Sequence, residues 1–64
     1  MKRVDFEKHL KNNGCKTKRE GANHSIWQNM LTQAVSAVPR HRELDNNLCK
    51  AICKQLGVAL PKKY

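Results

Sequence analysis

His24 is the side chain in this sequence whose position most favours acid–base chemistry. It follows a glycine-marked turn and begins an apolar run, within the stretch REGANHSIW. An imidazole has an unperturbed pKa of about 6.5, so it can take up and return a proton near neutral pH. The sequence therefore predicts His24 as a candidate catalytic residue. The alternative interpretation is an exposed histidine that only begins a strand.

Two further histidines and a set of cations complete the candidate residues. His41 stands in a basic corner after Pro39 and is either an auxiliary proton-transfer group or a capping or phosphate-contacting residue. His9 is interpreted as a surface residue of the first helix. The cations predicted to surround a phosphate group are Lys16, Lys18, Arg19, Arg40 and Arg42. For Lys16 and Lys18 the alternative is the solvated side of an edge strand, where lysines discourage edge-to-edge pairing.

The charge balance indicates a polyanionic partner. Thirteen Lys and Arg against five Asp and Glu give a net charge of +8 in 64 residues, which favours nucleic acid. The alternative is a basic domain without such a partner. No run approaches the ~20 apolar residues of a membrane span, and a membrane surface is not the expected partner because no basic amphipathic helix carries a large apolar face. The segment MKRVDFEKHL is too charged for a secretory signal, so a cytoplasmic protein is expected.

The cysteines do not predict a disulfide framework or a metal centre. There are three, an odd number, and no C-x-x-C or H-x-x-x-H pair is present. Cys49 and Cys53 are four residues apart and share a helix face, so they are interpreted as reduced core residues. The remaining route to a metal site is convergence of Cys15 with a histidine. No metal and no cofactor are expected.

Turn signals and hydrophobic periodicity predict the elements of the first part of the chain. Residues 3–13 predict a short helix with Phe6 and Leu10 on one face, ended by Gly14 in the left-handed conformation. Residues 15–20 predict a strand that is exposed on one face.

A turn over residues 21–23 leads to a second predicted strand, residues 24–28. Residues 34–38 predict a third strand, whose ladder ends at Pro39.

A second helix is predicted to end at Gly57. Asp45, Asn46 or Asn47 can cap its start. Its apolar stripe contains Leu48, Ile52 and Leu56. Neither helix can bury its stripe alone, so both are expected on one face of an antiparallel sheet, with the other face open.

The predicted fold class is α+β. The order α-β-β-β-α is that of double-stranded-RNA-binding domains. A single domain is expected over residues 1–64, with residues 58–64 as a loosely ordered tail.

Several motifs in this order make the chain resemble the HicA family of small toxin ribonucleases over roughly residues 1–58. They are a first helix that ends in NNG, a basic strand, a glycine turn that leads into NHSIW, the segment AVPRH and a last helix that ends in LGV. The most specific are the histidine after the glycine turn and the V-P-x-H segment at the end of the third strand.

The resemblance implies a double-stranded-RNA-binding-like fold, cleavage of mRNA without a metal, and neutralisation by a cognate HicB-like antitoxin. The family's catalytic histidine falls on His24. Its motif is commonly glycine-serine-histidine, which Ala22, Asn23 and His24 match here, with Gly21 one residue earlier. Because Ala22 resists a positive φ, Gly21 or Asn23 is expected to adopt any left-handed conformation of the turn.

The leading hypothesis is a metal-independent endoribonuclease toxin, because RNA carries its own nucleophile in the 2′-OH. The alternative is a non-catalytic RNA-binding module of the same architecture, and a third hypothesis is a module that binds an acidic protein. Trp27 has three open interpretations: stacking on a base, packing in the core, or contacting the antitoxin.

Overall fold

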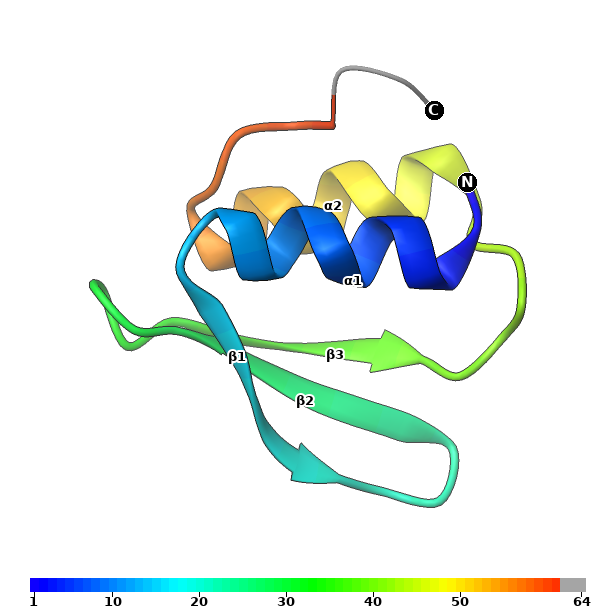
Figure 1. Ribbon diagram of the computed structural model, residues 1–64, viewed down its shortest axis with the longest axis horizontal. Coiled ribbons are helices and arrows are strands. Elements are labelled where there is room, and N and C mark those ends of the chain that lie inside the picture. Colours follow the sequence, from blue (N-terminus) through cyan, green and yellow to red (C-terminus); the bar gives the residue numbers. More distant parts are fainter. Residues whose placement is uncertain (62–64) are drawn as a thin grey trace.

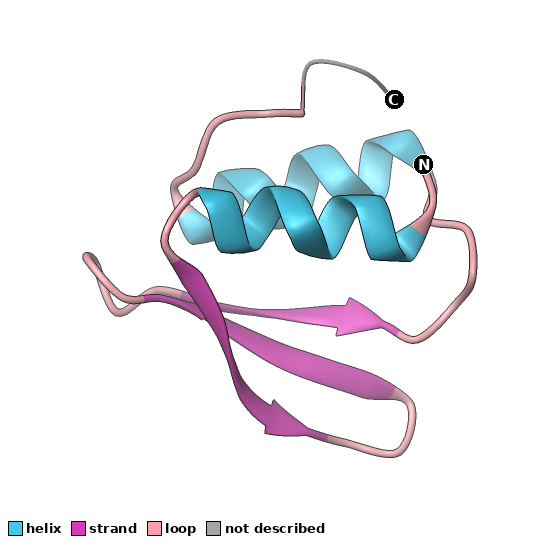
Figure 2. Ribbon diagram, in the orientation of Figure 1, coloured by secondary structure: helices cyan, strands magenta, loops and turns pink. Residues whose placement is uncertain are grey.

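Two helices cover one face of a three-stranded sheet in the computed structural model, which describes residues 1–61 (Figure 1). The elements in chain order are α1 (Arg3–Asn12), β1 (Cys15–Glu20), β2 (His24–Asn29), β3 (Val35–Pro39) and α2 (Asn46–Leu56). The sheet order is β1-β2-β3, and both pairings are antiparallel. Figure 2 shows the helices on the same side of the strands. The predicted fold class and the open sheet face are confirmed.

Both helices end where the sequence predicts, because each is followed by a glycine that adopts a left-handed conformation. Gly14 has φ of 81° and Gly57 has φ of 71°, values that cost glycine little and other residues more. The helix α2 begins after one of the three predicted cap positions. Asp45 is the N-cap residue, but its side chain makes no capping hydrogen bond.

The core lies between the two layers and is built from the apolar stripes of α1 and α2. Phe6 and Leu10 of α1 are fully buried against the sheet. Trp27 on β2 is 2% exposed and belongs to this core, so the interpretation as a base-stacking residue is wrong. The remaining buried apolar residues are Cys15, Val38, Leu44, Cys49, Ile52, Cys53 and Leu56.

The third strand begins and ends one residue later than the sequence predicts, at Val35 and Pro39 instead of residues 34 and 38. Pro39 is its last residue and pairs with His24. The sequence predicted that Pro39 would end the ladder, because proline has no N–H to donate. A proline is tolerated here because β3 is an edge strand, where alternate N–H groups face away from the sheet.

Residues 58–61 follow α2 without regular secondary structure and lie against the helical layer. Val58 packs on the core, Pro61 is buried, and His9 Nε2 lies 2.7 Å from the carbonyl oxygen of Ala59. Residues 62–64 of the expected tail lie outside the described residues. Within residues 1–61, no helix is long and apolar enough to cross a bilayer.

Candidate functional site

His24 is the first residue of β2 and projects from the open face of the sheet. Side chains alternate along β2, so Ser25, Trp27 and Asn29 face the helices and are buried, whereas His24 is exposed. The imidazole forms no hydrogen bond or ion pair within residues 1–61. Both of its ring nitrogens are therefore accessible to a bound molecule.

The turn before His24 depends on the absence of a side chain at Gly21. The Gly21 N–H donates to the carbonyl oxygen of His24 over 2.7 Å, and a Cβ at Gly21 would lie 2.8 Å from the same oxygen. No residue of the turn over 21–23 has a positive φ, so the turn contains no left-handed conformation for Gly21 or Asn23 to adopt. Glycine is required because two backbone segments approach closely.

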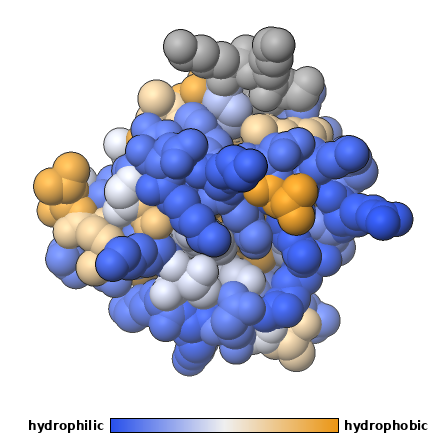
Figure 3. Space-filling model, viewed as in Figure 1, coloured by the Kyte–Doolittle hydropathy of each residue, from blue (hydrophilic) through white to orange (hydrophobic). Residues whose placement is uncertain are grey.

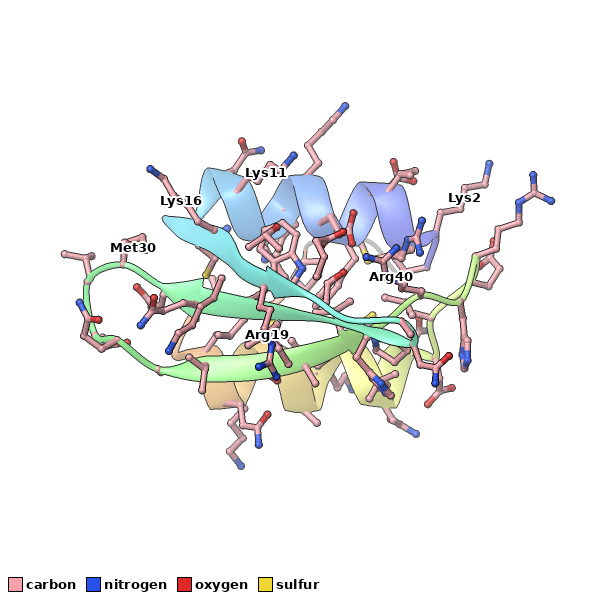
Figure 4. The ribbon with its side chains drawn as sticks, turned by 90° about the horizontal axis from the view of Figure 1, so that it is seen from below. Lys2, Lys11, Lys16, Arg19, Met30 and Arg40 are labelled. Carbon is pink, nitrogen blue, oxygen red and sulfur yellow. The ribbon has the colours of Figure 1, made fainter. Side chains whose placement is uncertain are left out.

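A β-bulge at Lys18 decides which side chains of β1 share the face of His24. Thr17 pairs with Trp27 and Arg19 pairs with Ile26, so Lys18 is an extra residue in the ladder. Regular alternation from Thr17 would direct Arg19 toward the helices, but the bulge directs it to the open face. Figure 4, which looks onto the sheet from below, shows Arg19 in front of the strands.

The predicted phosphate-binding residues are only partly brought together. Arg19 lies opposite Ile26, two positions from His24 on the same face of β2. Lys16 lies opposite Gln28, four positions from His24, or about 13 Å along the strand at ~3.3 Å per residue. The structure thus separates Lys16 from the surroundings of His24.

Arg40 lies at the same end of the sheet as His24, but its side chain turns to the helix side. Its backbone N–H donates to the carbonyl oxygen of Asn23 over 3.2 Å, and its guanidinium forms an ion pair with Glu20. Glu20 pairs with the buried Ser25 and therefore faces the helical layer.

His41 and Arg42 are exposed in the segment between β3 and α2. The carbonyl oxygen of Arg42 accepts a hydrogen bond from the Arg3 N–H over 3.0 Å, which ties this segment to the start of α1. Among the described residues, His41 makes no contact that links it to His24.

A shallow hollow of about 340 Å³ lies on the open face, and the sequence did not predict it. It is lined by Lys18, Arg19, Ile26 and Val35. Two aliphatic side chains thus lie beside two cations. One of them, Ile26, is two residues from His24 on the same face of β2. The alternation in HSIWQ places His24 and Ile26 on one face, and this signal was available in the sequence.

The three cysteine thiols are buried, and burial raises the pKa of each. The pKa of Cys53 is raised to about 11, mainly by burial and then by the neighbouring Cys49 and Cys15 thiols. These thiols are therefore protonated at neutral pH and take no part in the open face. Within residues 1–61, no group of three or more His, Cys, Asp or Glu side chains is arranged to hold a metal ion.

The family model for the HicA toxin of bacterial toxin–antitoxin systems matches residues 4–58, which is most of the chain. The chain belongs to the HicA toxin family. The matched segment runs from α1 to the residue after Gly57, so it includes all five elements of this HicA chain and every candidate residue. Comparison with curated proteins and with solved structures gave no significant match.

Membership in the HicA family establishes a toxin of a toxin–antitoxin system and implies a HicB-type antitoxin as its partner. The turn of this HicA chain carries Ala22 and Asn23 before His24, with the glycine one residue earlier, at Gly21. The close approach of Gly21 to the His24 carbonyl explains why a glycine is needed at that earlier position.

Proposed function

We propose that this HicA toxin is a metal-independent endoribonuclease that cleaves mRNA in the cytoplasm, with His24 as the proton-transfer group. The observation that carries the proposal is the placement of His24, which is exposed on the open face and lies two strand positions from the Arg19–Ile26 pair. A histidine and a cation on one solvated face are the groups that strand cleavage of RNA requires.

In the proposed reaction, His24 takes the proton of a 2′-OH while the 2′-oxygen attacks the adjacent phosphorus. The bond from phosphorus to the 5′-oxygen then breaks, and that oxygen, as it departs, takes up the proton that the His24 imidazolium returns. The products are a 2′,3′-cyclic phosphate and a 5′-OH end, so atoms and charge balance without water or a metal. Arg19 is suited to stabilise the charge on the phosphorane oxygens. His41 is the candidate for an auxiliary acid.

The RNA strand is proposed to lie across the open face at the hairpin end of the sheet. Lys18 and Arg19 lie beside the aliphatic side chains of Ile26 and Val35, which offer a surface for a ribose or a base. Arg40 and Arg42 lie at the same end, and Lys16 would contact a more distant phosphate. Because these contacts are ionic, binding should weaken steeply as salt is raised.

The test compares wild-type protein with His24→Ala and His24→Gln on a single-stranded RNA in buffer that contains EDTA. We expect wild type to cut and both variants to bind RNA without cutting it, because glutamine keeps a polar side chain but cannot carry a proton. His9→Gln is the matched control, since it alters a histidine on α1, away from the open face. DNA and RNA methylated at the 2′-oxygen should resist cutting.

Three results would contradict the proposal. Cutting by His24→Ala at the wild-type rate removes His24 from the reaction. Activity that is lost in EDTA and restored by magnesium or zinc identifies a metal-dependent enzyme. Binding of RNA by wild type with no cutting supports the non-catalytic RNA-binding module instead.

We also propose that the HicB-type antitoxin inhibits by covering His24 with an acidic surface, since buried cations need partners. Trp27 is not expected in this contact, because it lies on the helix side of β2, opposite to the face that carries His24. Reversing both Lys18 and Arg19 to Glu should slow association with the antitoxin at low salt. Unchanged association, or a footprint that leaves His24 open, would show that inhibition works by another route.

A further inference from the structure

A second groove, of about 370 Å³, lies on the other side of the sheet, between α1 and the inner face of β1 and β2. Cations border it from two sides: Arg3 and Lys11 lie on α1, and Arg40 is the residue that follows β3. Ser25 and Trp27 of β2 form its floor. No motif in the chain indicates this groove, because it depends on how α1 lies across the sheet.

Two buried hydrogen-bond donors at this groove have no acceptor within residues 1–61. They are Nε of Arg3 and Nε1 of Trp27, and both residues line the groove. The nearest carboxylate oxygen to Arg3 Nε is that of Glu7 at 3.9 Å, which is too long for a hydrogen bond. Folded proteins pair nearly all buried N–H groups, so an acceptor oxygen in this groove would be stabilised by these two donors.

The chemistry of the groove favours an anion rich in acceptor oxygens. The hydroxyl of Ser25, the two orphaned N–H groups and the cations all donate hydrogen bonds. Of the two carboxylates at the groove, Glu20 forms a close ion pair with Arg40, and Glu7 lies near the Arg3 guanidinium without a hydrogen bond to Nε. Figure 4 shows Lys11 on α1 and Arg40 near the adjacent strand end, and Figure 3 shows a largely hydrophilic surface over this part of the molecule.

We propose that this groove binds a backbone phosphate of the RNA strand whose cleavage is assigned to His24, an inference that rests on the proposed function. The groove and His24 are adjacent through the backbone: Ser25 follows His24 and faces the groove, while Arg40 follows Pro39, the partner of His24 in the sheet. A strand that crosses the open face at His24 and passes around this end of the sheet reaches Arg40 and then the groove.

The indole N–H of Trp27 gives a direct probe of the groove, because Trp27 is the single tryptophan of the chain. The experiment titrates ¹⁵N-labelled full-length protein with a single-stranded RNA methylated at every 2′-oxygen, which cannot be cut. We expect the indole cross-peak to shift and saturate at the same RNA concentration as the backbone amides of Arg19 and Ile26. The same titration with a poly-glutamate peptide tests a carboxylate source.

Lys11→Gln and Lys8→Gln form a matched pair, since both remove one exposed lysine from α1 but only Lys11 lines the groove. Loss of a charge-assisted contact to a phosphate should weaken RNA binding by about tenfold for Lys11→Gln, whereas Lys8→Gln should stay within about twofold. Cleavage by Lys11→Gln should show a raised KM with kcat retained, because the groove holds the strand and does not react with it. Glu20→Gln should strengthen binding severalfold by releasing Arg40.

Each contrary outcome has a separate meaning. If RNA shifts the amides of Arg19 and Ile26 but leaves the indole peak in place, the groove is not an RNA site and the proposed function stands. If poly-glutamate shifts the indole peak and RNA does not, the groove accepts a protein carboxylate and the inference is overturned. If RNA shifts neither face of wild type, the proposed function fails together with the inference.

Discussion

Replacing Gly21 by alanine should displace His24 and reduce RNA cleavage without touching any candidate residue. The added Cβ would lie 2.8 Å from the carbonyl oxygen of His24, a backbone atom that cannot move independently of β2. The turn must therefore open, which weakens the hydrogen bond of 2.7 Å from the Gly21 N–H to that oxygen. The start of β2 then shifts together with the imidazole it carries.

The expected loss of stability follows from these two contacts. Crowding of this kind in a packed site costs about 1 to 3 kcal/mol, and the weakened hydrogen bond falls within that range. For a domain of this size each kcal/mol lowers Tm by about 4 to 8 °C. Gly14→Ala supplies a matched control, since its φ of 81° is costly for alanine by about 1 to 2 kcal/mol but a Cβ there meets no atom within 4 Å.

The assay measures urea unfolding and RNA cleavage for both variants at a temperature where each is fully folded. Both should lose similar stability, but only Gly21→Ala should lose cleavage, because Gly14 lies at the opposite end of the β1–β2 hairpin from His24. If both variants cleave RNA at the wild-type rate, the reasoning that Gly21 positions His24 is refuted. If both lose cleavage to the same extent, the loss is caused by reduced stability and not by the position of His24.

Three further predictions concern stability. Asn29→Ala should lower the free energy of unfolding, measured in urea, by about 1 to 3 kcal/mol, because the buried Asn29 amide donates to the Leu56 carbonyl over 2.7 Å. Gln28→Ala is the control, since the contacts of Gln28 are exposed, and it should change this free energy by under about 0.5 kcal/mol. Stability should fall as pH rises from about 9 to 11, since native Cys53 keeps its proton up to a pKa of about 11 whereas the unfolded thiol loses it near 9. Urea unfolding across this range should show a shallower fall for Cys53→Ala, and identical slopes would contradict the raised pKa. Glu20→Ala should change stability by under about 1 kcal/mol by thermal unfolding, because its ion pair with Arg40 is exposed; a larger loss would show that the pair is a structural tie.

The elements could be predicted from the sequence because their signals are local. Gly14 and Gly57 end the helices as their type predicts, and the stripe of Phe6 and Leu10 faces the sheet. His24 at the start of a strand was also a local inference, made from the turn before it. The family resemblance, confirmed by the match over residues 4–58, rests on the same short motifs.

The parts that could not be predicted depend on pairing between strands. The bulge at Lys18 is set by how β1 meets β2, and no residue type near it marks the extra position. It decides that Arg19 shares the face of His24 while Glu20 turns to the helices and holds Arg40. From the sequence, Arg19, Arg40 and Lys16 are predicted as one set of phosphate-binding cations. The strand register instead places Arg19 and Lys16 at different ends of the open face, and the Arg40 side chain turns to the helix side.

The strands of the sheet are ordered as they are in the sequence, and this order limits the time that the antitoxin has to act. Strands that pair only with their neighbours in the sequence close short loops, so this topology folds on the order of milliseconds. Translation of 64 residues at ~5–20 residues per second takes about 3 to 13 s. Four core residues, Cys49, Ile52, Cys53 and Leu56, belong to α2, so the core stays incomplete until that helix leaves the ribosome. The core then forms almost at once, so a partner that neutralises the toxin must already be present when α2 leaves the ribosome.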